Sequence, residues 1–186
     1  MSIPVSREFA RWALRTALSG AVASVLSSVV VAFCSACETG RPVAGVNAAS
    51  QWLWGRRAKR QMGPSWRYTA VGYAVHHFSS MLWSGIYEYW NRRAATHSLA
   101  GAARRAAVVG ALACAVDYTV TPRRLRPGFE RHIGPTSIAA VYTAFAVGLL
   151  LAHGLETAQR RHSAGHRLPR PRLSRDPSSL VPNLRS

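Results

Sequence analysis

The sequence predicts an all-α membrane protein with four transmembrane helices, at about residues 14–36, 68–89, 101–120 and 136–155. Two observations predict this fold class. Apolar stretches of about 20 residues recur along the chain, and at about 1.5 Å per residue this length crosses a hydrocarbon core of about 30 Å. Arginines gather between the stretches rather than along one face of a helix, which is typical of polytopic membrane proteins.

The charge balance indicates which partners to expect. The chain carries 24 basic and 7 acidic residues, a net charge of +17. Because the basic residues flank apolar segments, we expect contact with the lipid bilayer and its anionic headgroups, and possible membrane-protein partners, but no nucleic acid. The excess of arginine over lysine, with abundant alanine, favours a bacterial source and hence the cytoplasmic (inner) membrane.

The first span is the clearest, since residues 16–36 contain no formally charged side chain. Arg7, Arg11 and Arg15 precede it and mimic the start of a signal peptide. The apolar run is too long for that, and no small-residue cleavage site ends it, so we interpret it as a retained helix.

The connection at residues 37–67 begins with the helix breakers Gly40 and Pro42. Trp52 and Trp54 then stand next to the basic run RRAKR, a combination that settles at membrane–water interfaces. We therefore expect a short interfacial or re-entrant helix at about residues 46–60.

The other spans are bounded by aromatic, charged or proline residues. Aromatic side chains flank the second at both ends, and Pro135 suits the first turn of the fourth. The third is marginal, because Arg104, Arg105 and Asp117 lie near its ends; such a residue costs about 2.5–3.5 kcal/mol at a helix centre and less towards the ends.

Four spans place both termini on one side of the membrane. The N-terminus, the connection around residue 92 and the tail together carry more basic residues than the other connections, so we expect cytoplasmic termini. Residues 1–158 then form a four-helix membrane domain. Residues 159–186, rich in Arg and Pro and poor in apolar residues, are expected to be a disordered tail.

Small residues at four-residue spacing predict where the helices meet, because close packing replaces the hydrophobic effect as the driving force in lipid. Every span has such a stripe, which favours a compact bundle. The stripes are Gly20, Ser24 and Ser28; Gly72, His76, Ser80 and Ser84; Ala106, Gly110 and Cys114; and Ala140, Ala144 and Gly148.

Three polar residues within the spans form a candidate intramembrane site: His76, His77 and Asp117. His76 belongs to a stripe and should face the bundle interior, as a metal or haem ligand, a proton relay or an interhelical hydrogen-bond partner. His77, turned by about 100°, should point elsewhere. Asp117 is expected to approach His76 only with an offset in depth or through water.

Glu88 ends the second span, and we expect an ion pair with Arg104 or Arg105 across the short turn.

Cys34 and Cys37 form a CxxC pair at the end of the first span, where two thiols can form a redox-active disulfide. Four-helix thiol-oxidising membrane enzymes use a second cysteine pair, and only Cys114 remains here. Cys34, Cys37, His76 and Cys114 are alternatively a possible set of metal ligands. No cofactor or catalytic residue follows from the sequence, which lacks a nucleotide-binding glycine loop and an HExxH motif.

Three groups of residues resemble a group of small, uncharacterised four-helix bacterial inner-membrane proteins. They are the run NAASQWLWG at residues 47–55; Gly72 with His76, His77 and Trp83; and Asp117 with the later run PRRLRPGFE and Tyr142. The resemblance covers about residues 10–155. It implies membrane location and supplies no biochemical activity.

The leading expectation is an integral inner-membrane protein with no evident catalytic apparatus, acting in a structural or accessory role through lipids, partner proteins or a small transported species. One alternative is a membrane redox or metal-site protein that uses His76 and the Cys34/Cys37 pair. Another is a small transporter, which requires a hydrated path past His76 and Asp117.

Overall fold

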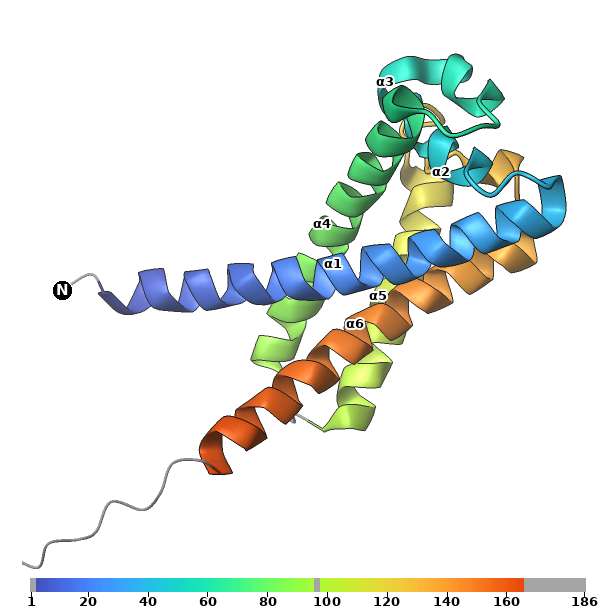
Figure 1. Cartoon of the computed structure of the whole chain (residues 1–186). Helices are drawn as coiled ribbons and strands as arrows, with labels where there is room; N and C mark the ends of the chain where they lie inside the picture. Colours follow the sequence, from blue (N-terminus) through green and yellow to red (C-terminus); the bar gives the residue numbers. More distant parts are fainter. Residues whose placement is uncertain (1–2, 96–97, 166–186) are drawn as a thin grey trace, which may run out of the picture.

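A computed structural model describes residues 3–95 and 98–165, and every regular element in these ranges is helical. Four helices are long: α1 (Ile3–Thr39), α4 (Val71–Arg93), α5 (Leu99–Ala115) and α6 (Pro135–Gly165). Helix α1 packs along both α4 and α6, and α5 packs along α6. The start of α1 and the end of α6 lie on the same side (Figure 1), opposite the two connections at residues 40–70 and 121–134.

Among the described residues, three helical stretches are long and apolar enough to cross a membrane: Arg7–Thr39, Leu99–Val120 and Pro135–Gln159. They coincide with the first, third and fourth predicted spans, so the structure supports a helical membrane protein. Helix α4, the predicted second span, is not among the three. Its two histidines, several serines and Glu88 lower its average hydropathy.

Two helices extend far beyond the predicted spans, and α4 continues a few residues past its predicted span to Arg93. Helix α1 begins at Ile3 and not near residue 14, and α6 continues through Gly165, past residue 155. Apolar windows identify only the part of a helix that suits lipid, whereas the same helix can continue with polar residues in water. Residues 159–165 of the expected tail are therefore helical, and residues 166–186 lie outside the described residues.

The helix ends are fixed by local chemistry. Ser98 caps α5 by accepting a hydrogen bond from the backbone N–H of Gly101 at 3.1 Å. Gly40 follows α1 with a φ of 69°, the left-handed conformation that glycine adopts at helix C-termini. Glu38, near the end of α1, accepts hydrogen bonds from Gly134 N, at 2.7 Å, and from the Ser137 hydroxyl. A carboxylate at the start of α6 suits the helix dipole and joins the two helices.

The connections at residues 40–70 and 121–134 pack together over one end of the long helices, and we call them the cap. In place of one short helix at residues 46–60, the cap has α2 (Ala44–Ala49), α3 (Gln51–Trp54) and the 3₁₀ segment η1 (Gly55–Arg60). Gly55, with a φ of 56°, interrupts the helix that the sequence predicted. A π-helical turn, η2 (Trp66–Ala70), leads into α4, and a 3₁₀ turn, η4 (Phe129–Arg131), precedes α6.

Three side chains hold the cap together. The Asn47 amide donates to the carbonyl oxygens of Gln61 and Gly63, both at 2.9 Å. Across the two connections, the Trp52 indole donates to Leu125 O at 2.7 Å, and the Gln51 amide donates to Arg126 O. These bonds satisfy backbone groups that would otherwise lack partners in irregular structure.

The small-residue stripes of three helices lie mostly where helices meet. On α1, α4 and α5 most of the stripe is buried, and a Cβ added to Gly20 would lie 2.6 Å from Met81 Sδ. The stripe predicted for α6 is partly wrong, since Ala140 is exposed and only Gly148 is fully buried. The larger side chains of Val141, Phe145 and Leu149, followed by Ala152, form the inner face of α6 instead.

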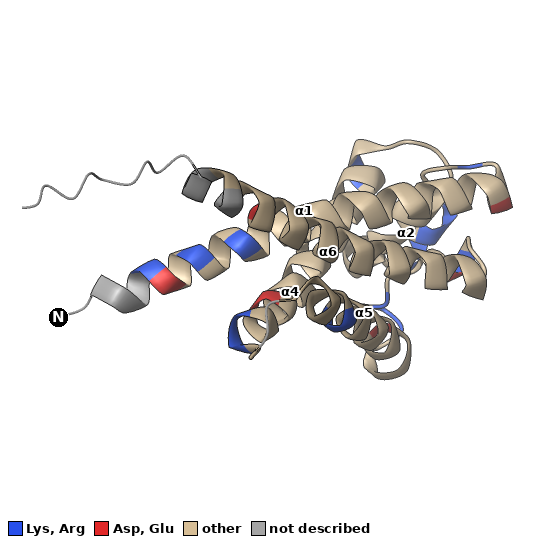
Figure 2. Ribbon diagram, turned by 90° about the horizontal axis from the view of Figure 1, so that it is seen from below, with Lys and Arg blue, Asp and Glu red and all other residues tan. Residues whose placement is uncertain are grey.

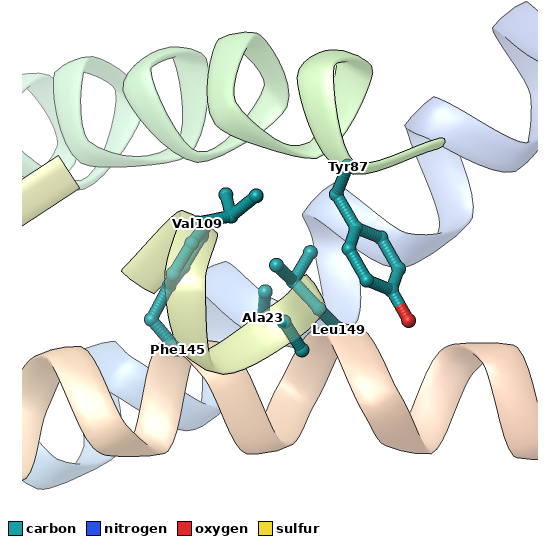
Figure 3. Close-up of a cluster of buried hydrophobic side chains, with 6 residues drawn as sticks. Ala23, Tyr87, Val109, Phe145 and Leu149 are labelled. Atoms are coloured by element: carbon teal, nitrogen blue, oxygen red, sulfur yellow. The ribbon is translucent and has the colours of Figure 1, made fainter. Parts of the chain in front are cut away.

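Those side chains of α6 complete the core. Phe145 and Leu149 pack with Ala23, Tyr87 and Val109, and so join all four long helices (Figure 3). Lys and Arg gather at the start of α1, the end of α4 and in the connections, whereas the middle of α1 carries no charged residue (Figure 2).

Candidate functional site

Both histidines of α4 face α1. His76 Nε2 lies 2.9 Å from Ser27 Oγ, and His77 Nδ1 lies 2.7 Å from Ser24 Oγ. The expectation that His77 points elsewhere is therefore wrong. Neighbouring helical residues are about 100° apart, so a pair that straddles the line of contact between two helices can place both side chains against the same partner.

The Ser27 hydroxyl indicates the protonation pattern of His76. Ser27 Oγ donates to Ala23 O, at 2.7 Å, one helical turn earlier. Because a hydroxyl has a single proton, Ser27 then accepts from His76, which places a proton on His76 Nε2. His77 is held additionally by stacking on Tyr73, with ring centroids 5.8 Å apart.

Asp117 lies at the end of α5 in a π-helical turn, η3 (Val116–Val120). The Tyr142 hydroxyl of α6 donates to Asp117 Oδ2 at 2.6 Å. Tyr118, the next residue, packs edge-on against the Tyr142 ring with centroids 6.3 Å apart. Single π-helical turns inside α-helices occur frequently at functional sites, because they redirect a side chain that a regular helix would place elsewhere.

His76 and Asp117 line one cavity of about 50 Å³. The cavity lies between α4, α5 and α6, and the cap residues Trp52, Leu125 and Pro127 form part of its wall. No direct hydrogen bond joins His76 to Asp117 in the described part of the chain, which agrees with the expected separation. A water needs about 10–15 Å³ of such space, so the cavity has room for several waters or one small solute.

The cavity wall combines polar and aromatic side chains. Ser27, Ser79, Ser80 and Tyr142 supply hydroxyl groups beside His76 and Asp117. The remaining wall is apolar, and four of its residues are aromatic: Trp52, Trp83, Phe129 and Phe145. The sequence did not single out Ser27, Trp52 or Phe129 for this site. The sequence signal that could have revealed a polar partner for the two histidines is the i, i+3 spacing of Ser24 and Ser27 on α1.

The cysteines do not join this site. Cys34, Cys37 and Cys114 are all free thiols, with Cys37 exposed and the other two half-buried. Within residues 3–95 and 98–165, no three His, Cys, Asp or Glu side chains lie close enough together to hold a metal ion. The suggested ligand set of Cys34, Cys37, His76 and Cys114 is thus not assembled, and the redox role of the cysteine pair stays a hypothesis.

The expected ion pair of Glu88 with Arg104 or Arg105 is not formed. Arg105 is only 5 % exposed and donates from Nε to Asn91 Oδ1 at 2.6 Å, one turn beyond Glu88. Glu88, 4 % exposed, instead faces the start of α1 and lines a groove with Arg15. An ion pair does join Arg15 to Glu156 of α6, at 3.2 Å. Asn91 therefore takes the place beside Arg105 that the sequence suggested for Glu88.

Two basic groups of the cap have perturbed acid–base behaviour. Partial burial lowers the pKa of His132, although a backbone hydrogen bond at Lys59 and the charge of Glu130 oppose the shift. Burial also lowers the pKa of Lys59, against the attraction of Glu130. His132 Nε2 is buried without a hydrogen-bond partner, so protonation there would place an unpaired charge inside the cap.

No known protein family, curated protein or solved structure matches this chain. The resemblance to small four-helix bacterial inner-membrane proteins therefore stays a prediction, and the function is argued from the site alone.

Proposed function

We propose that this chain is a four-span integral protein of the bacterial inner membrane with both termini in the cytoplasm. Helix α4 is the second span along the chain and adds to the three apolar ones of the described residues. Its 23 residues cover about 35 Å at 1.5 Å per residue, enough for the hydrocarbon core. Its exposed face is apolar, with Phe78, Leu82 and Ile86 at 67 %, 62 % and 44 % exposure.

The polar residues of α4 support this assignment because they face protein. His76 and His77 bond to α1, and Ser80 and Ser84 are buried. Ionisable residues inside membranes typically face the bundle interior and pair there. The low average hydropathy of α4 then reflects its inner face, whereas its outer face suits lipid.

Within this membrane domain, we propose that the cavity between His76 and Asp117 is a hydrated binding chamber for a small solute. The single observation that carries this proposal is the convergence of His76, Asp117 and Tyr142 on one cavity. Ionisable side chains at membrane depth are candidates for substrate, ion or proton pathways, and here two of them line the same space. Binding or passage of a small polar species therefore fits the site better than a purely structural role.

Cysteine accessibility tests whether the chamber is hydrated. In a variant without native cysteines, Ser80→Cys places a thiol in the chamber wall, and Ala106→Cys places one in the packed core. We expect a small charged methanethiosulfonate reagent to modify residue 80 and to leave residue 106 unmodified, because only hydrated thiols ionise and react readily. Equal lack of reaction at both positions would mean a dry interior, and would favour the structural or accessory role.

A further inference from the structure

A second polar hollow lies at the other end of the long helices, between the start of α1 and the end of α4. Two adjoining hollows, of about 370 and 210 Å³, share Glu8, Trp12 and Arg92 as lining residues. Phe9 and Tyr89 complete one hollow. Arg11, Arg15 and Glu88 complete the other. We call the two together the α1–α4 groove.

The groove has a defined floor. The Trp12 indole donates to Gly85 O at 3.4 Å, which fixes α1 against α4, and Phe9 packs on Trp12 with ring centroids 5.6 Å apart. Arg15 is held by its ion pair with Glu156. Arg11 and Arg92 are exposed, so their guanidinium groups are available to a ligand in the groove.

The groove lies where the apolar stretches of both helices end. The uncharged part of α1 begins directly after Arg15, and the uncharged part of α4 ends directly before Glu88. In a membrane orientation of these two helices, this level coincides with the lipid headgroups, where Trp, Tyr and Arg concentrate. A ligand with its polar part in the groove would have its acyl chains beside the apolar surfaces of α1 and α4.

The charges of the groove are balanced. Since Arg15 is paired with Glu156, the remaining charged side chains are two arginines, Arg11 and Arg92, and two glutamates, Glu8 and Glu88. Guanidinium groups bind phosphate oxygens through paired hydrogen bonds. The carboxylates would repel a headgroup that carries only negative charge, and they attract an ammonium group, which the face of Trp12 also favours. The Tyr89 ring already carries the guanidinium groups of Arg92 and Arg93, at 5.8 and 4.7 Å from its centroid.

We propose that the α1–α4 groove binds the headgroup of a zwitterionic phospholipid with a primary amine, of the phosphatidylethanolamine type. Arg11 and Arg92 contact the phosphate, and Glu8 and Glu88 with the indole ring contact the ammonium group. The inference rests on the proposed membrane orientation of α1 and α4 and does not depend on the chamber at His76. It refines the expectation of anionic headgroups drawn from the net charge.

Native mass spectrometry of the delipidated full chain in detergent tests this proposal. The probes are phosphatidylethanolamine, phosphatidylglycerol and phosphatidylcholine with matched acyl chains, and soluble glycerophosphoethanolamine. We expect phosphatidylethanolamine to bind at least fivefold more tightly than the other two lipids, because it alone combines a positive charge with N–H donors to carboxylates. The soluble headgroup should bind at least tenfold more weakly; equal affinity would overturn the assignment to a lipid.

Two exposed substitutions separate the parts of the groove. Arg92→Gln should weaken all three lipids, whereas Glu8→Gln should abolish the preference for phosphatidylethanolamine over phosphatidylglycerol. The matched control is Arg56→Gln, at an exposed arginine of the cap, which should leave the affinities for all three lipids unchanged. Equal binding of phosphatidylethanolamine and phosphatidylglycerol by the wild type, or identical behaviour of Arg92→Gln and Arg56→Gln, would overturn the proposal. The labelling of the chamber is an independent readout, so failure of one proposal does not imply failure of the other.

Discussion

Gly148 offers a sharp test of how the membrane domain packs. It lies on α6 where that helix meets α1, and a Cβ added there would be 2.5 Å from Ala23 Cα and 3.0 Å from Ala23 N. Favourable distances between carbon atoms begin near 3.5 Å, so the added carbon would lie about 1 Å too close to the Ala23 backbone. Because this backbone is part of a regular helical turn of α1, relief requires movement of a whole helix.

The matched control lies on the same helix. A Cβ added to Gly154 has no other heavy atom within 4 Å. Glycine to alanine within a helix is worth about 1 kcal/mol in favour of alanine at either position, and this gain cancels when the two variants are compared. The overlap at Gly148 remains, and overpacking costs about 1–3 kcal/mol.

We therefore expect Gly148→Ala to be less stable than Gly154→Ala by about 1–3 kcal/mol. Unfolding in mixed micelles with a rising fraction of SDS, followed by far-UV circular dichroism, measures the free energies of unfolding. The free energy of unfolding of Gly154→Ala itself should equal or exceed that of the wild type. Two variants that unfold at the same SDS fraction would refute the close approach of α1 and α6 on which the fold depends.

Three further predictions follow from the polar interactions and the cap. Tyr142→Phe removes the hydroxyl that donates to Asp117 and should lower the free energy of unfolding in the same assay by about 1–3 kcal/mol. The control Tyr73→Phe alters a ring that stacks on His77 and should have little effect. Equal effects of the two variants would contradict the role of the Tyr142 hydroxyl. The pKa of His132 is lowered in the folded protein, so below its unfolded value of about 6.5 the unfolded state binds more protons and the free energy of unfolding decreases as the pH is lowered. The decrease in the free energy of unfolding from pH 7.5 to pH 5 should be smaller in His132→Phe than in the wild type. An unchanged decrease would exclude His132 as its source. Cys37, exposed at the cap end of α1, should react with a membrane-impermeant maleimide from the periplasmic side of intact cells, and labelling only after lysis would contradict the proposed orientation.

Helix positions were predictable because apolar length is a local property of the sequence. Residues 16–36 have no charge and lie within α1, and the stretch at residues 68–89 lies within the helical residues 66–93. The stripe on α6 was less predictable, since close approach there needs one glycine, Gly148, and large residues fill the remaining space. Small-residue spacing alone does not reveal which face a neighbouring helix covers.

The candidate site was predictable only in part. His76 was expected to face the interior, and the structure places it there beside Ser27. His77 was assigned to another direction because a helical wheel shows the angles between side chains on one helix. It does not show how wide a surface the neighbouring helix covers, and here α1 contacts both histidines. The partners of Asp117 and Glu88 depend on the π-helical turn at residues 116–120 and on how α4 packs against α1 and α5, which have no local sequence signal.

The number of times the chain crosses the membrane tests the central claim most directly. Reporter fusions to the N-terminus and to the C-terminus, one active only in the cytoplasm and one only in the periplasm, give the side of each end. Four spans, with α4 among them, predict that both termini are cytoplasmic. Termini on opposite sides would mean that only the three most apolar helices cross, and would contradict the placement of His76 at membrane depth.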